Sequence, residues 1–280
     1  MERLTTIAAM RAARRQARAG GQSLGLVPTM GALHRGHLSL VRAARATCDQ
    51  VTVSIFVNPL QFGPTEDFAR YPRTPDADCA LLAEEGVDFV FSPSVEEMYP
   101  QGATTLVHVG GIGDRLDGAS RPGHFDGVAT VVAKLFHIVE PERAFFGQKD
   151  AAQLAVLCAM VRDLDFGLEL VACPTVREAD GLALSSRNRY LSPEEREEAL
   201  VLSRALAAVE TLAAGGERRA GALVEAAMQL LSAQPRVRVD YVAAVDAGTL
   251  EPVAEALPGT LFAIAAWVGA TRLIDNVLLG

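Results

Sequence analysis

The chain has 280 residues, of which 50% are hydrophobic, and its 34 acidic and 26 basic residues give a formal net charge of −8. This length exceeds the usual range for one hydrophobic core, so we expect one large and one smaller domain. A nucleic-acid-binding surface is not expected, because such surfaces show clustered positive charge. Small anionic substrates are compatible with the composition, since a local field can differ in sign from the net charge.

The four cysteines, Cys48, Cys79, Cys158 and Cys173, lie far apart and form no CxxC pair. This spacing argues against a disulfide framework and a cysteine-based metal site, and it favours a reducing compartment, the cytoplasm. No apolar run approaches the roughly 18 residues needed to cross a bilayer. The longest candidate, 261–270, is ended by Thr271-Arg272. We therefore expect no membrane partner.

The first 175 residues alternate between short apolar runs and helical patterns. An arginine-rich stretch, 11–18, is predicted to form a surface helix ended by Gly20-Gly21, rather than an organellar targeting peptide. Strands are then expected at 24–27, 51–56, 87–91, 143–146 and 168–171, with helices at 38–45, 76–85, 127–139 and 151–161. This alternation predicts an α/β domain with a doubly wound parallel sheet, Rossmann-like, over residues 1–175.

The usual nucleotide-binding fingerprints are missing from this domain. Gly111-Ile112-Gly113 lacks the third glycine of the dinucleotide motif, and no GxxxxGK[ST] sequence occurs. Neither a dinucleotide-dependent dehydrogenase nor a P-loop enzyme is indicated.

The pattern changes after Cys173-Pro174-Thr175. Ser192-Pro193-Glu194-Glu195 predicts a capping box that opens a helix ending at Gly215-Gly216. A second helix is expected at 218–231, followed by strands at 237–245 and 262–268. Residues 176–280 are therefore predicted to form a smaller α+β domain.

The segment VPTMGALHRGH, residues 27–37, places two histidines around a glycine where a buried strand leads into an amphipathic helix. His34 and His37 are three residues apart and can share one face of the helix N-terminus. Backbone N–H groups and the helix dipole attract anions there, and Gly36 has no side chain to keep a phosphate away. The structural alternative is that one histidine caps the helix while the other packs. The pair with its glycine favours an anion site.

Only two of the 26 basic residues are lysines, Lys134 and Lys149. Lys149 lies between the predicted strand 143–146 and the predicted helix 151–161, at the edge where open α/β sheets bind ligands. An ammonium is a compact charge suited to a transferring phosphoryl group. A plain surface lysine is the alternative, although the helix dipole disfavours a cation at a helix start.

Two loops of the first domain carry further candidate side chains. Asn58 and Gln61 follow the predicted strand 51–56 and offer neutral donors and acceptors for hydroxyls or a carboxylate. A turn-forming asparagine is an equally good explanation of Asn58 alone. Residues 121–125, RPGHF, open a helix and are interpreted chiefly as a capped turn, with contact to a ligand as the less favoured alternative.

Two more candidates follow Lys149 in the chain. Gln153 comes four residues later, which places it on the same helical face as Lys149. Ser185-Ser186-Arg187 lies just beyond the expected domain boundary and supplies two hydroxyls, backbone N–H groups and a guanidinium. Such a loop can serve as a mobile clamp for a polyphosphate.

Together these segments resemble the pantothenate synthetase family, the pantoate:β-alanine ligases, over essentially the whole chain. The matching motifs are PTMGALHRGH (28–37), FVNPLQF (56–62), YPRT (71–74), RPGHF (121–125), FGQKD (146–150) and LSSRN (184–188). The family belongs to the nucleotidyl transferases related to class I aminoacyl-tRNA synthetases. His34-Arg35-Gly36-His37 resembles their HIGH motif, and Ser185-Ser186-Arg187 resembles their KMSKS loop. Leu184 departs from the methionine common in the family, a nearly volume-conserving change.

The resemblance implies that ATP and pantoate form a pantoyl adenylate, which β-alanine converts to pantothenate, with release of pyrophosphate and AMP. The implied catalytic residues are His34, His37, Lys149, Ser185, Ser186 and Arg187. The implied ATP site comprises Pro28, Thr29, Met30, Gly31, His34, Gly36, His37, Gly147, Gln148, Lys149, Asp150, Val176, Leu184, Ser185, Ser186 and Arg187, with Asp150 on the ribose. The implied pantoate site comprises Met30, Asn58, Gln61 and Gln153.

The resemblance also implies that Mg²⁺ enters with ATP, since this ion keeps water and phosphate ligands. Its protein ligands are not assigned, and Asp78 is at most an outer contact. A homodimer is expected.

Two other classes of function are weighed against this one. An adenylyl transferase acting on a phosphate acceptor would keep the two histidines, but it would not need Gln61 and Gln153 and would release no free AMP. A nucleotide-binding regulator without catalysis would be expected to have lost part of the set. Every charged catalytic position is filled in this chain.

Overall fold

The computed structural model describes residues 1–64 and 66–280, which form two compact units. The first unit comprises Met1–Gly113, Arg121–Gly147 and Val156–Cys173, and the second comprises Asp114–Ser120, Gln148–Ala155 and Pro174–Gly280. The second unit therefore includes two short segments that a division at residue 175 assigns to the first domain.

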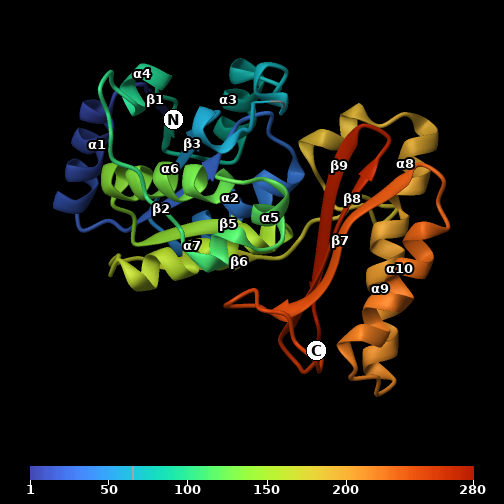
Figure 1. Ribbon diagram of the computed structural model, residues 1–280. Coiled ribbons are helices and arrows are strands. Elements are labelled where there is room, and N and C mark those ends of the chain that lie inside the picture. Colours follow the sequence, from blue (N-terminus) through green and yellow to red (C-terminus); the bar gives the residue numbers. More distant parts are fainter. Residues whose placement is uncertain (65) are drawn as a thin grey trace. The chain divides into compact units, whose positions relative to one another are not determined.

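The first unit is built on a six-stranded parallel sheet with the strand order β1-β4-β3-β2-β5-β6 (Figure 1). The strands are β1 Glu2–Leu4, β2 Leu24–Thr29, β3 Gln50–Ile55, β4 Phe89–Phe91, β5 Arg143–Gly147 and β6 Glu169–Cys173. All neighbouring pairs are parallel. The predicted fold class is confirmed. Sequence analysis missed β1, because only Leu4 of its three residues is buried and no periodic pattern can develop over that length.

Helices pack on both faces of this sheet. Among them are α1 Ile7–Ala19, α2 Arg35–Thr47, α3 Pro75–Glu84, α4 Val95–Met98, α6 His124–Val139 and α7 Ala151–Asp163. Val27 of β2 packs in one cluster with Val41 of α2 and Leu82 of α3. Leu26 is fully buried too and points to the opposite face, because side chains alternate along a strand. Helix α1 ends at Gly20, as predicted.

The direction of strand order reverses at β2, with β3 and β4 on one side and β5 and β6 on the other. Open α/β sheets bind ligands outside the carboxyl ends of the strands at such a switch point. Strands β2 and β5 end at Thr29 and Gly147. The segments that follow these two residues are thus the ones from which a ligand site is expected.

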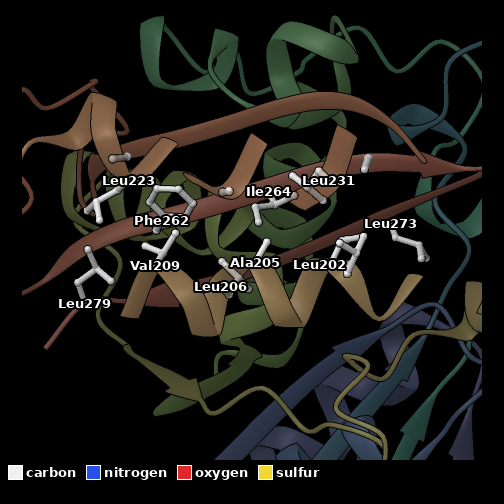
Figure 2. Close-up of a cluster of buried hydrophobic side chains, with 14 of the residues drawn as sticks. Leu202, Ala205, Leu206, Val209, Leu223, Leu231, Phe262, Ile264, Leu273 and Leu279 are labelled. Atoms are coloured by element: carbon white, nitrogen blue, oxygen red, sulfur yellow. The ribbon is translucent and has the colours of Figure 1, made fainter. Parts of the chain in front are cut away.

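The second unit packs helices against a three-stranded antiparallel sheet of order β7-β8-β9. Its elements are α5 Asp117–Ser120, α8 Pro193–Ala199, α9 Val201–Ala214, α10 Ala220–Ser232, β7 Val237–Asp246, β8 Thr260–Val268 and β9 Thr271–Leu278. Leu202 and Leu206 of α9, Leu223 of α10, and Phe262 and Ile264 of β8 meet in its core (Figure 2).

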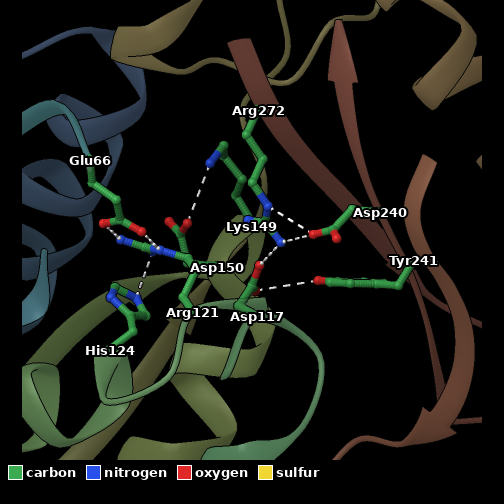
Figure 3. A network of polar contacts seen from close by, with 9 residues as sticks. All are labelled: Glu66, Asp117, Arg121, His124, Lys149, Asp150, Asp240, Tyr241 and Arg272. Carbon is green, nitrogen blue, oxygen red and sulfur yellow. Dashed lines mark hydrogen bonds and ion pairs between the residues drawn. The ribbon is translucent and has the colours of Figure 1, made fainter. Parts of the chain in front are cut away.

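The segment Asp114–Ser120 is fastened to this sheet by ion pairs. Arg272 of β9 lies 2.7 Å from Asp117 Oδ1 and 2.8 Å from Asp240 Oδ2, and the Tyr241 hydroxyl donates to Asp117 Oδ2 at 3.3 Å (Figure 3). Burial raises the pKa of Tyr241, so its hydroxyl stays a donor. These contacts explain why a segment between two parts of the first unit belongs to the second.

One prediction for the C-terminal region needs correction, and one strand was missed. The capping box at Ser192 is present, with Glu195 N–H donating to Ser192 Oγ and Ser192 N–H to Glu195 Oε2. The helix it opens, however, stops at Ala199, and a second helix starts at Val201. Strand β9 was not predicted, because a polar pair, Thr271-Arg272, was interpreted as the end of the preceding apolar run.

No helix among the described residues is long and apolar enough to cross a membrane. The apolar run 261–270 forms most of β8 and the turn into β9.

Candidate active site

The two histidines form a reciprocal cap at the N-terminus of α2. His34 Nδ1 accepts a hydrogen bond from the backbone N–H of Gly36 at 3.2 Å, and His37 Nδ1 accepts one from the backbone N–H of His34 at 3.3 Å. The ring centroids lie 4.1 Å apart. Because each Nδ1 is an acceptor, a neutral ring carries its proton on Nε2. The cap and an anion site are therefore compatible, since Nδ1 accepts from the helix backbone and the proton of a neutral ring lies on Nε2.

The turn that leads from β2 to His34 is held by a buried carboxylate. Asp78, 2% exposed, accepts from the backbone N–H groups of Ala32 at 3.0 Å and Leu33 at 2.8 Å, and from the Thr74 hydroxyl at 3.1 Å. Gly31 has φ +82°, and a Cβ there would lie 3.0 Å from Asp78 Oδ2. Asp78 thus fixes the direction in which the chain enters α2.

Asn58 organises the loop after β3, which contains the short helical turn η1 Pro59–Gln61. Its Nδ2 donates to Gln61 Oε1 and to the Gly127 carbonyl, each at 3.0 Å. Its Oδ1 accepts from the Tyr99 hydroxyl at 2.8 Å and from the Leu60 N–H at 3.3 Å. An amide offers two donors and two acceptor positions, so all four are used within the protein. Asn58 is 1% exposed, and this geometry supports a role in shaping the loop.

Gln61 and Met30, both expected in the pantoate site, are in contact. Gln61 Nε2 lies 3.2 Å from Met30 Sδ. The loop is pressed against α6 at Gly127, where a Cβ would lie 2.3 Å from the Leu60 carbonyl oxygen. Only glycine permits this approach, which sets the position of the 58–61 loop.

Two side chains, Arg121 and His124, contact the backbone carbonyl of Gln61, and Glu66 binds Arg121; Figure 3 shows these three side chains. Arg121 donates to both carboxylate oxygens of Glu66 at 2.6 Å and to the Gln61 carbonyl at 3.2 Å. His124 Nδ1 lies 2.8 Å from the same carbonyl, and its Nε2 lies 2.9 Å from Arg121 Nη1. Burial by itself would raise the pKa of Glu66, but the hydrogen bonds and charge of Arg121 outweigh it, so the pKa is lowered.

Lys149 lies in the helical turn η4 Gln148–Asp150, immediately before α7. Its Nζ donates to Asp150 Oδ1 at 3.3 Å, and its side chain is 20% exposed. Asn276 of β9, 6% exposed, donates from Nδ2 to the carbonyls of Gln148 at 3.0 Å and Lys149 at 2.8 Å. The turn that carries Lys149 is therefore attached to the C-terminal sheet. Gln153 belongs to the first turn of α7, so Lys149 and Gln153 do not share one regular helix.

The loop with the two serines is fixed at its base. Ser185 caps the turn η5 Ser186–Tyr190, and its Oγ accepts from the Arg187 N–H at 3.2 Å. Asn188 Nδ2 donates to the Ala183 carbonyl at 3.1 Å and to Glu178 Oε1 at 2.9 Å. These hydrogen bonds fix the backbone of the loop where it joins the rest of the second unit.

The expected site residues divide between the two units. The first unit contains Pro28, Thr29, Met30, Gly31, His34, Gly36, His37, Asn58, Gln61 and Gly147. The second contains Gln148, Lys149, Asp150, Gln153, Val176, Leu184, Ser185, Ser186 and Arg187. Within residues 1–64 and 66–280, no group of three or more His, Cys, Asp or Glu side chains is arranged to hold a metal ion.

Sequence reasoning missed the residues that support the site. Gly127 gave no signal, because a close approach between a helix and a loop has no local pattern. Asn276 could not be found before β9 was known. Asp78 was considered only as an outer contact of Mg²⁺, and Tyr99 was not considered. Their hydrogen bonds to the backbone of Ala32 and Leu33 and to Asn58 show that they support the site.

The chain matches the family model for pantoate-beta-alanine ligase over residues 2–278. It is 65% identical to the pantothenate synthetase of Acidobacterium capsulatum over 292 residues, covering 100% of this chain and 97% of that protein. It is 59% identical to the pantothenate synthetase of Moorella thermoacetica over 279 residues, covering 100% and 99% of the two chains.

Solved structures agree with this assignment. The crystal structure of pantothenate synthetase from Thermus thermophilus matches with a TM-score of 0.94 at 51% identity, covering 99% of both chains. A pantoate-beta-alanine ligase from Francisella tularensis, crystallised with beta-gamma ATP and beta-alanine, matches with a TM-score of 0.81 at 33% identity over 99% of this chain and 97% of its own. The full-length match in sequence, fold and motif order shows that the chain belongs to the pantoate–β-alanine ligase family.

Proposed function

We propose that the chain joins pantoate to β-alanine through a pantoyl adenylate. ATP-dependent ligation of these two substrates is the activity of the family to which the chain belongs. The adenylate route is the finer claim, and the observation that carries it is the reciprocal histidine cap. Two Nε2–H donors at a helix N-terminus, on the turn that follows β2, form an arrangement suited to phosphate oxygens.

In the first step, a carboxylate oxygen of pantoate attacks the α-phosphorus of ATP in line. A new oxygen–phosphorus bond forms, the bond to the bridging oxygen of the β-phosphate breaks, and pyrophosphate leaves with the bonding electrons. No protein nucleophile takes part, so the chain acts by positioning and by stabilising charge.

The phosphate-binding roles are assigned residue by residue on the family motifs. His34 and His37 donate from Nε2 to phosphate oxygens, while Lys149, Ser185, Ser186 and Arg187 neutralise charge at the α-phosphorus and on the departing pyrophosphate. Removing one such preorganised donor typically costs about 3–4 kcal/mol of transition-state stabilisation. Asp150 accepts from the ribose hydroxyls, and the backbone of the remaining ATP-site residues surrounds the nucleotide.

Pantoate is assigned to Gln61, Gln153 and Met30. The amide groups of the two glutamines suit its hydroxyls and carboxylate, and Met30, already in contact with Gln61, suits its methyl groups. Asn58 has its amide fully engaged within the loop, so the geometry favours an indirect role in which it presents Gln61.

In the second step, the unprotonated amine of β-alanine attacks the activated carbonyl carbon. A carbon–nitrogen bond forms, the carbon–oxygen bond to AMP breaks, and the amine nitrogen gives up a proton to water. AMP is a good leaving group, so this step again needs orientation rather than covalent catalysis.

Mg²⁺ is proposed to enter as the complex with ATP, held by phosphate oxygens and water. This fits a chain whose described residues offer no cluster of metal-ligating side chains, and in which Asp78 already accepts three hydrogen bonds. A homodimer and a cytoplasmic location are proposed on the family resemblance and the cysteine usage. Light scattering coupled to gel filtration tests the dimer.

Pantoate labelled with ¹⁸O in its carboxylate tests the adenylate route. Incubation with ATP, Mg²⁺ and β-alanine should yield pantothenate, pyrophosphate and AMP that carries one ¹⁸O atom. Pantoate-dependent exchange of pyrophosphate into ATP should also occur without β-alanine. ADP as product, or AMP without label, would contradict the mechanism, and transfer of AMP onto the product would indicate an adenylyl transferase instead.

A further inference from the structure

We infer that Tyr99 is a positioning residue for pantoate, which acts through Asn58 to hold the Gln61 amide with its Nε2 donor toward the substrate. The inference rests on the proposed function in one respect, the assignment of Gln61 to pantoate. Tyr99, directly after α4, has no role in the reaction described above. The residues that carry the argument all belong to the first unit.

The orientation of the Asn58 amide is fixed by two backbone groups. The Leu60 N–H can only donate, and it lies 3.3 Å from Oδ1, whereas the Gly127 carbonyl can only accept, and it lies 3.0 Å from Nδ2. Oδ1 is therefore the acceptor that faces Tyr99. Because this oxygen lies 2.8 Å from the Tyr99 hydroxyl, the hydroxyl donates its proton to Asn58. Burial raises the pKa of Tyr99, which keeps that proton in place at neutral pH.

The next hydrogen bond fixes the Gln61 amide. Asn58 Nδ2 donates to Gln61 Oε1 at 3.0 Å, so the amide nitrogen of Gln61 lies at the other end of the group. There Nε2 lies 3.2 Å from Met30 Sδ, a weak acceptor. Nε2 carries two N–H donors, and Met30 needs only one of them. Gln61 can thus offer an N–H to an acceptor oxygen of pantoate, whose ionised carboxylate can only accept.

The Tyr99 hydroxyl matters because Asn58 is 1% exposed, so water cannot replace a lost donor at Oδ1. The bond from Tyr99 is the shorter of the two that Oδ1 accepts, 2.8 Å against 3.3 Å from the Leu60 N–H. Without it, the Asn58 amide loses part of its restraint, and Gln61 spends a smaller fraction of time in the orientation that binds pantoate. The apparent affinity falls in proportion to that fraction.

Tyr99→Phe tests this role, because it removes the hydroxyl and keeps the ring. The ring contacts do not involve the hydroxyl: the Phe56 ring centroid lies 6.1 Å from that of Tyr99, and Lys134 Nζ lies 5.7 Å from the Tyr99 centroid. In initial rates with saturating ATP and β-alanine, we expect the KM for pantoate to rise about tenfold. The KM for ATP should stay the same. An unchanged KM for pantoate, or an equal rise in the KM for ATP, would overturn the inference.

Thr130→Val is the matched control. Thr130 of α6 is 4% exposed, and its hydroxyl accepts from the Val107 N–H at 2.9 Å. The substitution removes another buried, hydrogen-bonded hydroxyl from the same unit, so the KM for pantoate should keep its wild-type value. Thermal unfolding confirms that each variant is folded at the assay temperature. A rise in KM for pantoate as large as that in Tyr99→Phe would assign the effect to general destabilisation and refute the positioning role.

A double-mutant cycle tests whether Tyr99 acts through Gln61. In the Gln61→Ala background the amide is gone, so Tyr99→Phe should cause no further rise in the KM for pantoate. Equal fold-changes in the two backgrounds would show that the residues act independently, against the inference.

Gln61→Glu tests the direction of the hydrogen-bond chain. Its carboxylate still accepts from Asn58 but cannot donate to pantoate, so the KM for pantoate should rise at least as far as in Gln61→Ala. A near wild-type KM in Gln61→Glu would show that Gln61 is an acceptor, which contradicts the assigned orientation.

The same variants separate this inference from the proposed function. If Gln61→Ala binds pantoate normally, the assignment of Gln61 to pantoate fails. If Gln61→Ala raises the KM for pantoate but Tyr99→Phe does not, the role of Tyr99 alone is refuted.

Discussion

Gly127→Ala is a sharp test of the way the 58–61 loop is positioned. Gly127 lies in the interior of α6, where alanine is ordinarily the better helix former by about 1 kcal/mol. A Cβ at this position would, however, lie 2.3 Å from the Leu60 carbonyl oxygen and 2.7 Å from the Gln61 nitrogen. Optimal nonbonded contacts are about 3.5 Å, so the loop must retreat by roughly 1 Å.

Two costs oppose the gain in helix propensity. Overpacking of this kind costs about 1–3 kcal/mol, and retreat of the loop stretches the bond of 3.0 Å from Asn58 Nδ2 to the Gly127 carbonyl, worth about 1 kcal/mol. We therefore expect net destabilisation of about 1–3 kcal/mol. A displacement of about 1 Å at Gln61 should also raise the KM for pantoate by at least tenfold, with little change in the KM for ATP.

Gly221→Ala provides the matched control. Gly221 lies in α10 and is exposed, and a Cβ there would meet no atom within 4 Å. Gly221→Ala should therefore raise the free energy of unfolding by up to about 1 kcal/mol and leave the KM for pantoate unchanged. Urea unfolding and initial rates with varied pantoate measure both effects. The reasoning is refuted if Gly127→Ala gains stability as Gly221→Ala does and binds pantoate normally.

Three further predictions concern other parts of the site. Lys149→Ala should lower the rate of pantoate-dependent pyrophosphate exchange by about 10²–10³-fold or more, while the circular dichroism spectrum stays unchanged. A near-normal exchange rate would show that Lys149 does not stabilise the transferring phosphoryl group. Asn276→Leu removes the donor to two carbonyls of the Lys149 turn, so kcat should fall while the KM for pantoate stays the same; a change in KM alone would contradict this. Because Arg121 lowers the pKa of Glu66 below 4.5 in the folded state, this carboxylate contributes stability above pH 4.5 and loses it as the pH falls through the lowered value. The free energy of unfolding should accordingly decrease less on acidification in Glu66→Gln than in the wild type. An equal decrease in both proteins would argue against the ion pair.

The local sequence predicted a helix or strand correctly where a single pattern of residues is enough to specify that element. The strands β2, β3 and β5 were predicted because contiguous apolar runs fit strands that are covered on both faces. Strand β6, at the end of the sheet and partly exposed, was predicted from its apolar residues as well. Gly20 ended α1 as expected. These elements depend on the backbone preferences of their own residues and on hydrophobic periodicity within a dozen residues. Both can be read from the sequence without knowledge of the fold.

Prediction failed where burial contradicts the local pattern. Strand β9 carries the polar residues Arg272, Asp275 and Asn276. In the sequence, these residues look like the end of the preceding apolar run and not like a strand. In the structure these side chains are paired within the second unit, Arg272 with Asp117 and Asp240, and Asp275 with Arg177. Buried polar groups of this kind are stable only with their partners, and no local window contains partners from so far along the chain.

The sequence by itself determined which chemistry the chain brings: two histidines at a helix start, a lysine after a central strand, and a serine-serine-arginine loop, in the order of one ligase family. Tertiary structure alone decided how those groups are presented. Gln61 is held by His124 from 63 residues away, and the Lys149 carbonyl by Asn276 from 127 residues away. The His34–His37 cap assigns their Nε2 protons, and Asn58 uses its whole amide within the loop. Such contacts form only when the packed core brings two segments within about 3 Å of each other. Which segments meet depends on the packing of the whole chain and not on any local stretch of sequence.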